Sequence, residues 1–268
     1  MTGHTDAQRL TFIDALQLNE ELDYRTKRPA KIIETTISYS IIRKEIRDKI
    51  IKTFDKAGLL STFEFYADND SLVARVSYIN DTLNRLKLSR VYEVRSRNNL
   101  IRQTSKYSYD SRKFLTGNLD LDSNGNFIRK TKIICNEKGN PIEVSLLDSN
   151  NNLIARERAT YFYSTNKVIR SIVMSDIPVI NDKDSLKISI KYESKYPSVD
   201  EVYNSYGDKV KWKEKNDIDR RTYYEREYDY DYYGNWIGSK IYLVRFRKNG
   251  ELYKELKSII NREISYNE

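Results

Sequence analysis

The amino-acid sequence predicts an all-β fold: an extended, twisted antiparallel meander of repeated hairpins, with a short N-terminal helix. Two observations carry this prediction. A short turn recurs along most of the 268 residues, with Asp or Asn, two polar residues, Gly or Asn, and then an aliphatic residue. Between the turns, apolar and polar residues alternate with the period of two that marks a half-buried strand.

The residue types of the turn have a conformational reason. Gly adopts positive φ without steric cost, and Asn and Asp tolerate it better than other residues. Asx side chains also accept hydrogen bonds from the backbone just downstream, and hairpin loops need positions of positive φ to match the twist of their strands. The copies of the turn lie at 54–59, 122–127, 136–140, 148–153, 230–235 and 247–250.

The spacing of the turns agrees with a meander. Within each run, the positions that mark successive turns lie about 12–14 residues apart, which is the length of one strand plus one turn. These markers are Gly58 and Asp70 in one run, and Asn99, Arg112, Gly125, Gly139 and Asn151 in the other.

Four segments follow each other along the chain. Residues 1–28 are predicted to be a helical segment, because Asp6 can cap a helix whose next turns carry spaced apolar residues. Residues 29–174 form a β-repeat region that Pro29 opens, residues 175–202 an insertion or junction, and residues 203–268 a C-terminal β-repeat region. The two β-repeat regions can equally belong to one continuous domain. Alternation favours a strand over a helix near 251–260.

Charge and aromatic content favour a solvated sheet surface. The chain has 47 basic and 39 acidic residues, a net charge of +8, but opposite charges are interleaved, as in Arg156-Glu157-Arg158. A nucleic-acid interface usually concentrates its positive charge. The 22 tyrosines suit an exposed meander, since tyrosine can lie half in a core and half in water.

Few residues are available for chemistry. His4 is the only histidine and Cys135 the only cysteine, which excludes an internal disulfide and leaves no support for a Ser-His-Asp device or a His- or Cys-rich metal site. We therefore predict that the protein is not an enzyme and has no cofactor and no metal. Carboxylate pairs of the glycosidase kind are recognised only in space. The acidic residues of 225–231 are expected to pair with Lys and Arg across the sheet instead.

One segment is similar to the first half of a calcium-binding loop. Residues 120–128 place Asp, Asp, Asn and Gly at the expected positions, but Thr131 stands where a bidentate carboxylate is required. The flanking residues have the pattern of strands. We interpret the segment as a hairpin turn, with weak calcium binding as the alternative.

No stretch approaches the ~18 apolar residues of a membrane-spanning helix, so we predict no membrane span. The first residues, 1–9, lack the basic start and apolar core of a secretory signal. They leave open whether Met1 is native or replaces a removed signal.

The block 228–237, which reads Tyr-Asp-Tyr-Asp-Tyr-Tyr-Gly-Asn-Trp-Ile, resembles the YD repeat, the RHS-like unit with the core Tyr/Phe-Asp-x-x-Gly-Asn/Arg-aliphatic. In pattern, residues 29–266 also resemble β-repeat proteins common in Bacteroidetes. The order of residues is changed at Tyr206-Gly207-Asp208, and Arg97-Asn98-Asn99 lacks Gly. The resemblance implies a protein of the cell envelope or a secreted protein, while a cytoplasmic location stays open.

The most promising recognition surface is the strand that precedes the YD-like turn, with its neighbours. Planar aromatic side chains on one strand face can stack on sugars, bases or extended peptides, or simply on each other as a ladder within the sheet. The candidate ligand-binding residues are Trp212, Tyr224, Arg226, Tyr228, Tyr230, Tyr232 and Trp236.

The predicted function is a non-catalytic scaffold or binding protein of a bacterial envelope or exterior. One alternative is a carbohydrate-binding or carbohydrate-active protein that uses the Tyr/Trp surface. Another is a basic nucleic-acid-binding protein. The residue pattern favours a protein or glycan partner over nucleic acid.

Overall fold

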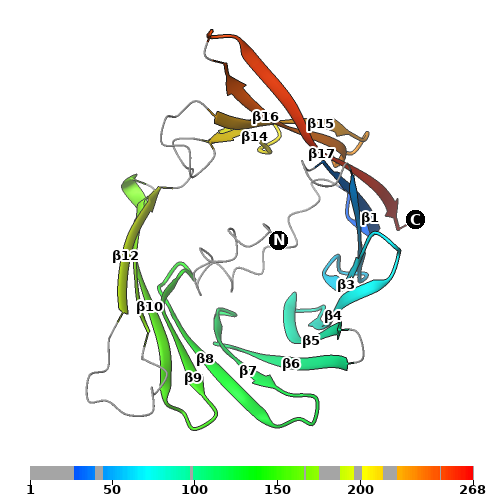
Figure 1. The fold of residues 1–268 in the computed structure, drawn as a ribbon. Coiled ribbons are helices and arrows are strands. Elements are labelled where there is room, and N and C mark those ends of the chain that lie inside the picture. Colours follow the sequence, from blue (N-terminus) through cyan, green and yellow to red (C-terminus); the bar gives the residue numbers. More distant parts are fainter. Residues whose placement is uncertain are drawn as a thin grey trace. The chain divides into compact units, whose positions relative to one another are not determined.

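The structure, a computed structural model, describes residues 27–39, 45–96, 99–165, 167–174, 188–195, 201–213, 222–247 and 249–267. These residues form strands joined by tight turns, with one short 3₁₀ helix, Tyr163–Thr165 (Figure 1). The predicted all-β meander is confirmed. The predicted N-terminal helix and His4 lie outside the described residues.

The first strand in the described residues begins at Pro29, where the sequence predicts a strand, and the segment near 251–260 is a strand. Their bounds are β1 (Pro29–Ser38), β2 (Ile46–Phe54), β3 (Leu60–Tyr66), β4 (Leu72–Asp81), β5 (Leu86–Ser96), β6 (Asn99–Tyr109), β7 (Leu115–Leu121), β8 (Phe127–Cys135), β9 (Pro141–Asp148), β10 (Leu153–Phe162), β11 (Lys167–Met174), β12 (Ile188–Lys195), β13 (Glu201–Tyr203), β14 (Lys209–Lys213), β15 (Thr222–Tyr230), β16 (Trp236–Phe246) and β17 (Leu252–Tyr266).

The chain divides into two compact units. The first contains the described residues within Ile79–Tyr92 and Ile101–Pro197, and the second those within Glu20–Tyr78, Glu93–Leu100 and Ser198–Glu268. The predicted junction at 175–202 lies mostly outside the described residues, so the predicted segment boundaries stay a prediction.

The second unit contains the first and last strands of the fold. β17 pairs antiparallel with β16 on one side and with β1 on the other, and β1 in turn pairs with β2. Figure 1 shows the red end of the chain beside the blue β1. This pairing places Glu34 opposite Arg262 and Ile32 opposite Ile264. Ile32 belongs to a small core with Phe54 and Leu60.

In the first unit, β6 to β11 form an uninterrupted antiparallel ladder that continues into β12. Its core consists of Ile133, Val144 and Ala159, which neighbouring strands place on one face. Half-buried Leu115 and Tyr161 pack against it. The small size of this core agrees with a meander that has a solvated face.

Nine turns in the described part of the chain have the same backbone geometry. The first residue donates its N–H to the carbonyl of the fifth, and the fourth donates to the carbonyl of the first. The fourth residue has positive φ in every case, as in a type I turn followed by a left-handed residue. In seven of these turns an Asx side chain at the first position also accepts N–H bonds from the third and fifth residues.

The predicted turn markers are accurate with two exceptions. Lys113, not Arg112, takes the left-handed conformation, and Asn99 begins strand β6. The turn at Asn204, in which Gly207 has positive φ, has the common geometry although its sequence order looked different. Backbone geometry therefore tolerates more sequence variation than the repeat pattern suggests.

The turn hydrogen bonds also make the stability of the fold depend on pH in the acidic range. The N–H of Phe114 lowers the pKa of Asp110, and the side-chain amides of Asn126 and Asn152 lower the pKa of Asp122 and Asp148. A carboxylate with a lowered folded-state pKa stabilises the fold above its unfolded pKa of about 4. That contribution is lost as the pH falls through the folded-state value.

Candidate binding surface

Six of the seven predicted binding residues lie on one face of the second unit. Strand β15 ends at Tyr230, so that Tyr224, Arg226, Tyr228 and Tyr230 alternate onto the same face. Trp212 of β14 lies opposite Tyr224, and Trp236 of β16 lies opposite Tyr230. We call the aromatic members of this face, together with Tyr206, the aromatic ladder: Trp212, Tyr224, Tyr228, Tyr230, Trp236 and Tyr206.

The rings of the aromatic ladder stack on each other. Trp212 and Tyr224 are stacked with ring centroids 5.4 Å apart, and Tyr206 and Tyr230 at 4.3 Å. Tyr228 stacks on Tyr230 at 5.9 Å. These rings are half-buried, except that of Tyr206, which is exposed. Such pairs stabilise a sheet by about 0.5–1.5 kcal/mol each beyond the area that they bury.

The tyrosine hydroxyl groups of the ladder also have partners in the sheet. Tyr230 donates to the Asp208 carboxylate at 2.6 Å and accepts from the Asn204 amide at 2.7 Å. Tyr228 donates to the carbonyl of Lys209 at 3.3 Å. These bonds tie β15 to the turn between β13 and β14.

Two arginines enclose the central part of the ladder. The Arg226 guanidinium lies 4.7 Å from the ring centroid of Tyr228 and 5.0 Å from that of Trp236. Arg262 of β17 lies 3.2 Å from the Trp236 centroid and forms an ion pair of 2.8 Å with Glu34 of β1. Burial lowers the pKa of Arg226, and the nearby positive charge of Arg262 lowers it further.

Tyr232 lies apart from the other predicted residues, and the expectation that it continues the strand face is wrong. It occupies the second position of the turn after Tyr230, with 97% of its surface exposed, and contacts only the edge of Tyr233 among the described rings. The alternating pattern was extended one step beyond the end of the strand.

Sequence reasoning missed three residues of this face. Arg262 and Glu34 come from strands that are paired across most of the chain, and Ser239 lies opposite Tyr228 on β16. No local pattern could reveal the first two, because nothing in the sequence states that β17 pairs with β1. Glu34 lies two residues after the buried Ile32, on the same side of β1, and its side chain is only 13% exposed.

The opposite face of β15 carries paired charges. Lys254 contacts Glu225 at 2.5 Å and lies 4.0 Å from Glu227, which agrees with the expectation that these acidic residues pair across the sheet. On this face Lys211 lies over the ring of Tyr223, 3.9 Å from its centroid. The two faces of the strand therefore differ, with ion pairs on one and stacked rings on the other.

The YD-like turn is hydrogen-bonded to strand β17. Tyr266 of β17 donates its hydroxyl hydrogen bond to Asp231 and accepts one from the side-chain amide of Asn235 at 2.8 Å. Asn235 is almost fully buried and also donates to the carbonyl of Lys27. Burial, together with the hydrogen bond to Asp231, raises the pKa of Tyr266 to about 12.

This shift predicts a specific alkaline sensitivity. An unfolded tyrosine has a pKa of about 10, so the stabilisation from Tyr266 is complete below pH 10 and is lost as the pH rises through 12. We expect Tyr266→Phe to lower the free energy of unfolding by about 1 kcal/mol at pH 7. The difference between wild type and variant should shrink between pH 10 and 12.

Urea unfolding at pH 7, 10 and 11 measures this difference, with Tyr232→Phe as the control for the titration of an exposed tyrosine. A difference that stays constant over this range would contradict the link between Tyr266 ionisation and stability.

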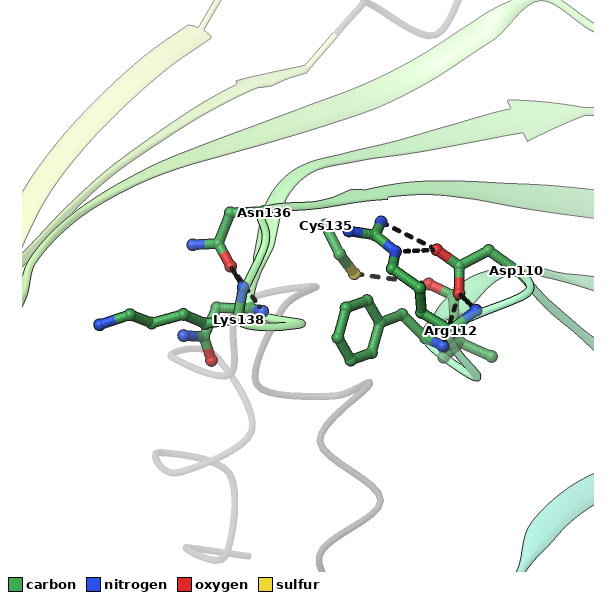
Figure 2. A network of polar contacts seen from close by, with 8 residues as sticks. Asp110, Arg112, Cys135, Asn136 and Lys138 are labelled. Atoms are coloured by element: carbon green, nitrogen blue, oxygen red, sulfur yellow. Dashed lines mark hydrogen bonds and ion pairs between the residues drawn. The ribbon is translucent and has the colours of Figure 1, made fainter. Parts of the chain in front are cut away.

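A second polar cluster, in the first unit, surrounds Cys135 (Figure 2). Asp110 forms an ion pair of 2.9 Å with Arg112, and the Cys135 thiol donates to the carbonyl of Leu115 at 3.6 Å. Burial and the negative charge of Asp110 raise the pKa of Cys135. A thiol with a raised pKa is a poor nucleophile at neutral pH.

Tyr163 contacts the turn beside Cys135 through both its hydroxyl and its ring. Asn136 and Asn140 both donate their side-chain amides to the Tyr163 hydroxyl, at 2.7 and 2.8 Å, and the Lys138 ammonium lies 3.6 Å from the Tyr163 centroid. Figure 2 shows Asn136 and Lys138 on one side of Cys135 and the Asp110–Arg112 pair on the other.

The calcium-like segment forms the hairpin turn between β7 and β8. Asp122 accepts hydrogen bonds from the backbone and side chain of Asn126, and the buried Asp120 accepts from Arg129 at 2.6 Å and from Ser105 at 2.6 Å. Both carboxylates are thus occupied by protein donors. In the described ranges, no group of three or more His, Cys, Asp or Glu side chains is arranged to hold a metal ion.

Among the described residues, no helix is long enough and apolar enough to cross a membrane.

Comparison with known proteins yields distant structural likenesses alone. A porin-like protein from Bacteroides uniformis aligns over 91% of this chain and 99% of its own at 13% identity, with a TM-score of 0.47. A porin-like protein from Bacteroides vulgatus aligns over 90% and 99% at 11% identity, with a TM-score of 0.29. The Tc holotoxin pore of Photorhabdus luminescens aligns over 79% of this chain and 14% of its own at 10% identity, with a TM-score of 0.28.

No family model and no curated protein matches the sequence. Because every one of these TM-scores is below 0.5, the structural likenesses assign neither a family nor a function. The resemblance to YD repeats stays a prediction from the sequence.

Proposed function

We propose that the protein is a non-catalytic β-repeat scaffold or binding protein of a bacterial envelope or exterior. The observation that carries this proposal is that the side chains of the aromatic ladder contact each other and the sheet. Its rings stack on each other, and the hydroxyls of Tyr228 and Tyr230 bond within the sheet. This arrangement supports a rigid surface that binds through shape, and the resemblance to YD repeats favours the location.

Carbohydrate recognition is the second candidate. The ladder is half-buried rather than enclosed, and it presents planar rings at regular intervals along one strand with Arg226 among them. Sugar rings stack on such side chains through their C–H faces. Nucleic-acid binding has less support, because Arg262 and Lys209 are paired with Glu34 and Glu201. Charges that are neutralised within the sheet do not neutralise phosphates.

Native affinity electrophoresis against polysaccharides and nucleic acids, at low and high salt, tests this proposal. Retardation by a polysaccharide that persists at high salt, without release of reducing ends, would support a binding protein. Retardation by nucleic acid that disappears with salt would contradict it, as would turnover of any retained polysaccharide. No retardation by either class supports a scaffold with protein partners.

The role of the ladder can be tested with Trp236→Ala. Because Trp236 contacts Tyr228, Arg226 and Arg262, we expect its truncation to lower the free energy of unfolding by about 2 kcal/mol, less than for a fully buried tryptophan. Tyr232→Ala, at an exposed position, should change stability by less than about 0.5 kcal/mol. Thermal melts beside the binding assay separate the two roles. A loss of binding with an unchanged melt would show that Trp236 contacts ligand and does not stabilise the fold.

A further inference from the structure

Two arginines lie at the centre of the ladder, and the carboxylates of Glu34 and Asp208 lie on the same face. Arg226 and Arg262 lie on the same face, and both bonds from Arg262 to Glu34 go to one carboxylate oxygen, at 2.8 Å each. Arg226 donates its Nε and one Nη to the hydroxyl of Ser239, at 3.1 and 3.0 Å. Within the described residues, Arg226 forms no ion pair.

A guanidinium in this position is suited to an anion. It carries five N–H donors in a planar fork that matches a carboxylate, and the Ser239 hydroxyl uses two of them at a single point. Its charge is partly removed from water because Arg226 is half-buried, and this burial lowers its pKa. Glu34 and Asp208 act on Arg226 through space, but they bond Arg262 and Tyr230 instead. A partly desolvated cation that forms no direct ion pair gains from an anionic partner within reach of its N–H groups. The rings of Tyr228 and Trp236 hold the group in place.

The surroundings of Arg226 favour an anionic group that is carried by a linear oligosaccharide. Successive residues on one strand face lie about 6.6–6.8 Å apart, so the ladder presents planar groups before and after Arg226 along β15. Tyr224 stands on one side with Trp212, and Tyr230 on the other with Tyr206. A linear oligosaccharide with apolar ring faces can follow such a row.

We propose that Arg226 binds the carboxylate of a uronic acid in a polysaccharide that stacks on the aromatic ladder. This inference rests on the proposed function as a binding protein and names its ligand class. A polymer with sparse carboxylates fits better than a polyanion such as nucleic acid, because Asp208 and Glu34 lie on the same face and repel closely spaced phosphates.

The test compares a glucuronoxylan, which carries scattered uronic acids, with the same polymer after chemical reduction of its carboxyl groups. Affinity electrophoresis at low and high salt should show retardation of the wild-type protein by the native polymer and at least about tenfold weaker binding to the reduced one. A sulfated polysaccharide and single-stranded DNA complete the panel.

Three variants assign the effect to Arg226. Arg226→Gln should weaken binding to native glucuronoxylan at least about tenfold, to the level of the reduced polymer. Arg226→Lys should bind with intermediate affinity, since it keeps the charge and loses the planar fork. Lys240→Gln removes the same charge from the opposite face, where Lys240 lies across from Glu227, and should leave binding unchanged. Thermal melts establish that each variant is folded, and Arg226→Lys carries the test if Arg226→Gln does not fold.

Equal binding to native and reduced polymer would overturn the carboxylate assignment and leave the binding-protein proposal standing. So would an Arg226-dependent preference for the sulfated polymer, or equal losses in Arg226→Gln and Lys240→Gln. Absence of retardation by glucuronoxylan overturns the uronic acid as ligand, while a scaffold role survives. Salt-sensitive retention of single-stranded DNA alone would overturn both proposals.

Discussion

Glu34→Gln should lower the free energy of unfolding of the second unit by about 3 kcal/mol. The Arg262 side chain is only 3% exposed and that of Glu34 13%, so the substitution leaves a buried guanidinium without its counter-charge. Breaking a buried ion pair from one side typically costs 3–5 kcal/mol. The nearby Arg226 adds to the cost, because the repulsion between its charge and that of Arg262 is then no longer offset by the charge of Glu34.

The measurement is urea unfolding followed by tryptophan fluorescence. The protein has two tryptophans, Trp212 and Trp236, and both belong to the ladder of the second unit, so the signal reports the unit that contains Glu34. Glu251→Gln is the matched control. Its partner Arg247 is 56% exposed and Glu251 59%, and exposed pairs contribute about 0–1 kcal/mol. Equal effects of the two substitutions would show that the Glu34–Arg262 pair does not stabilise the fold.

A double-mutant cycle isolates the interaction itself. Arg262→Gln combined with Glu34→Gln removes both charges, and we expect the double variant to be more stable than the sum of the two single losses predicts. Strict additivity would mean that the two groups act independently despite their 2.8 Å separation.

Gly117→Ala should lower the free energy of unfolding of the first unit by about 3 kcal/mol. Gly117 is buried in β7, and a Cβ atom there would lie 2.4 Å from the carbonyl oxygen of Thr131 on the neighbouring strand. That oxygen belongs to the backbone and cannot rotate away, so the β7–β8 ladder must shift. Overpacking usually costs about 1–3 kcal/mol, and a collision between two backbones belongs at the upper end.

Gly125→Ala is the matched control in the turn between the same two strands. Gly125 has a φ of 82° but nothing within 4 Å of an added Cβ, so the cost should be only the left-handed strain of about 1 kcal/mol. Because the first unit contains no tryptophan, unfolding is followed by far-ultraviolet circular dichroism and by amide exchange of β7 and β8. A larger effect of Gly125→Ala than of Gly117→Ala would contradict the predicted collision.

Local turn geometry was the most predictable part of this protein. A single residue with positive φ and a nearby Asx side chain is enough to build each turn, and both lie within five residues of sequence. The same logic failed at Lys113 because a lysine, unlike Gly, Asn or Asp, carries no visible mark of positive φ. It also failed at Tyr232, where alternation persists although the turn has begun.

The candidate surface was predictable along β15 and not across the sheet. Alternation alone places Tyr224, Arg226 and Tyr228 on one face. The pair of Glu34 and Arg262, 228 residues apart, depends on the register between β1 and β17, which no short-range pattern encodes.

The sequence by itself determined the all-β class, the positions of most turns and the alternation of each strand, because backbone sterics and side-chain period act over a few residues. Only the tertiary structure decided which strands are neighbours. That choice places Arg262 over the ring of Trp236 and pairs Glu34 with Arg262. It gives Arg226 the hydroxyl of Ser239, and not a carboxylate, as its hydrogen-bond partner. Long-range pairing sets the electrostatic character of the surface because it decides which charges are neutralised.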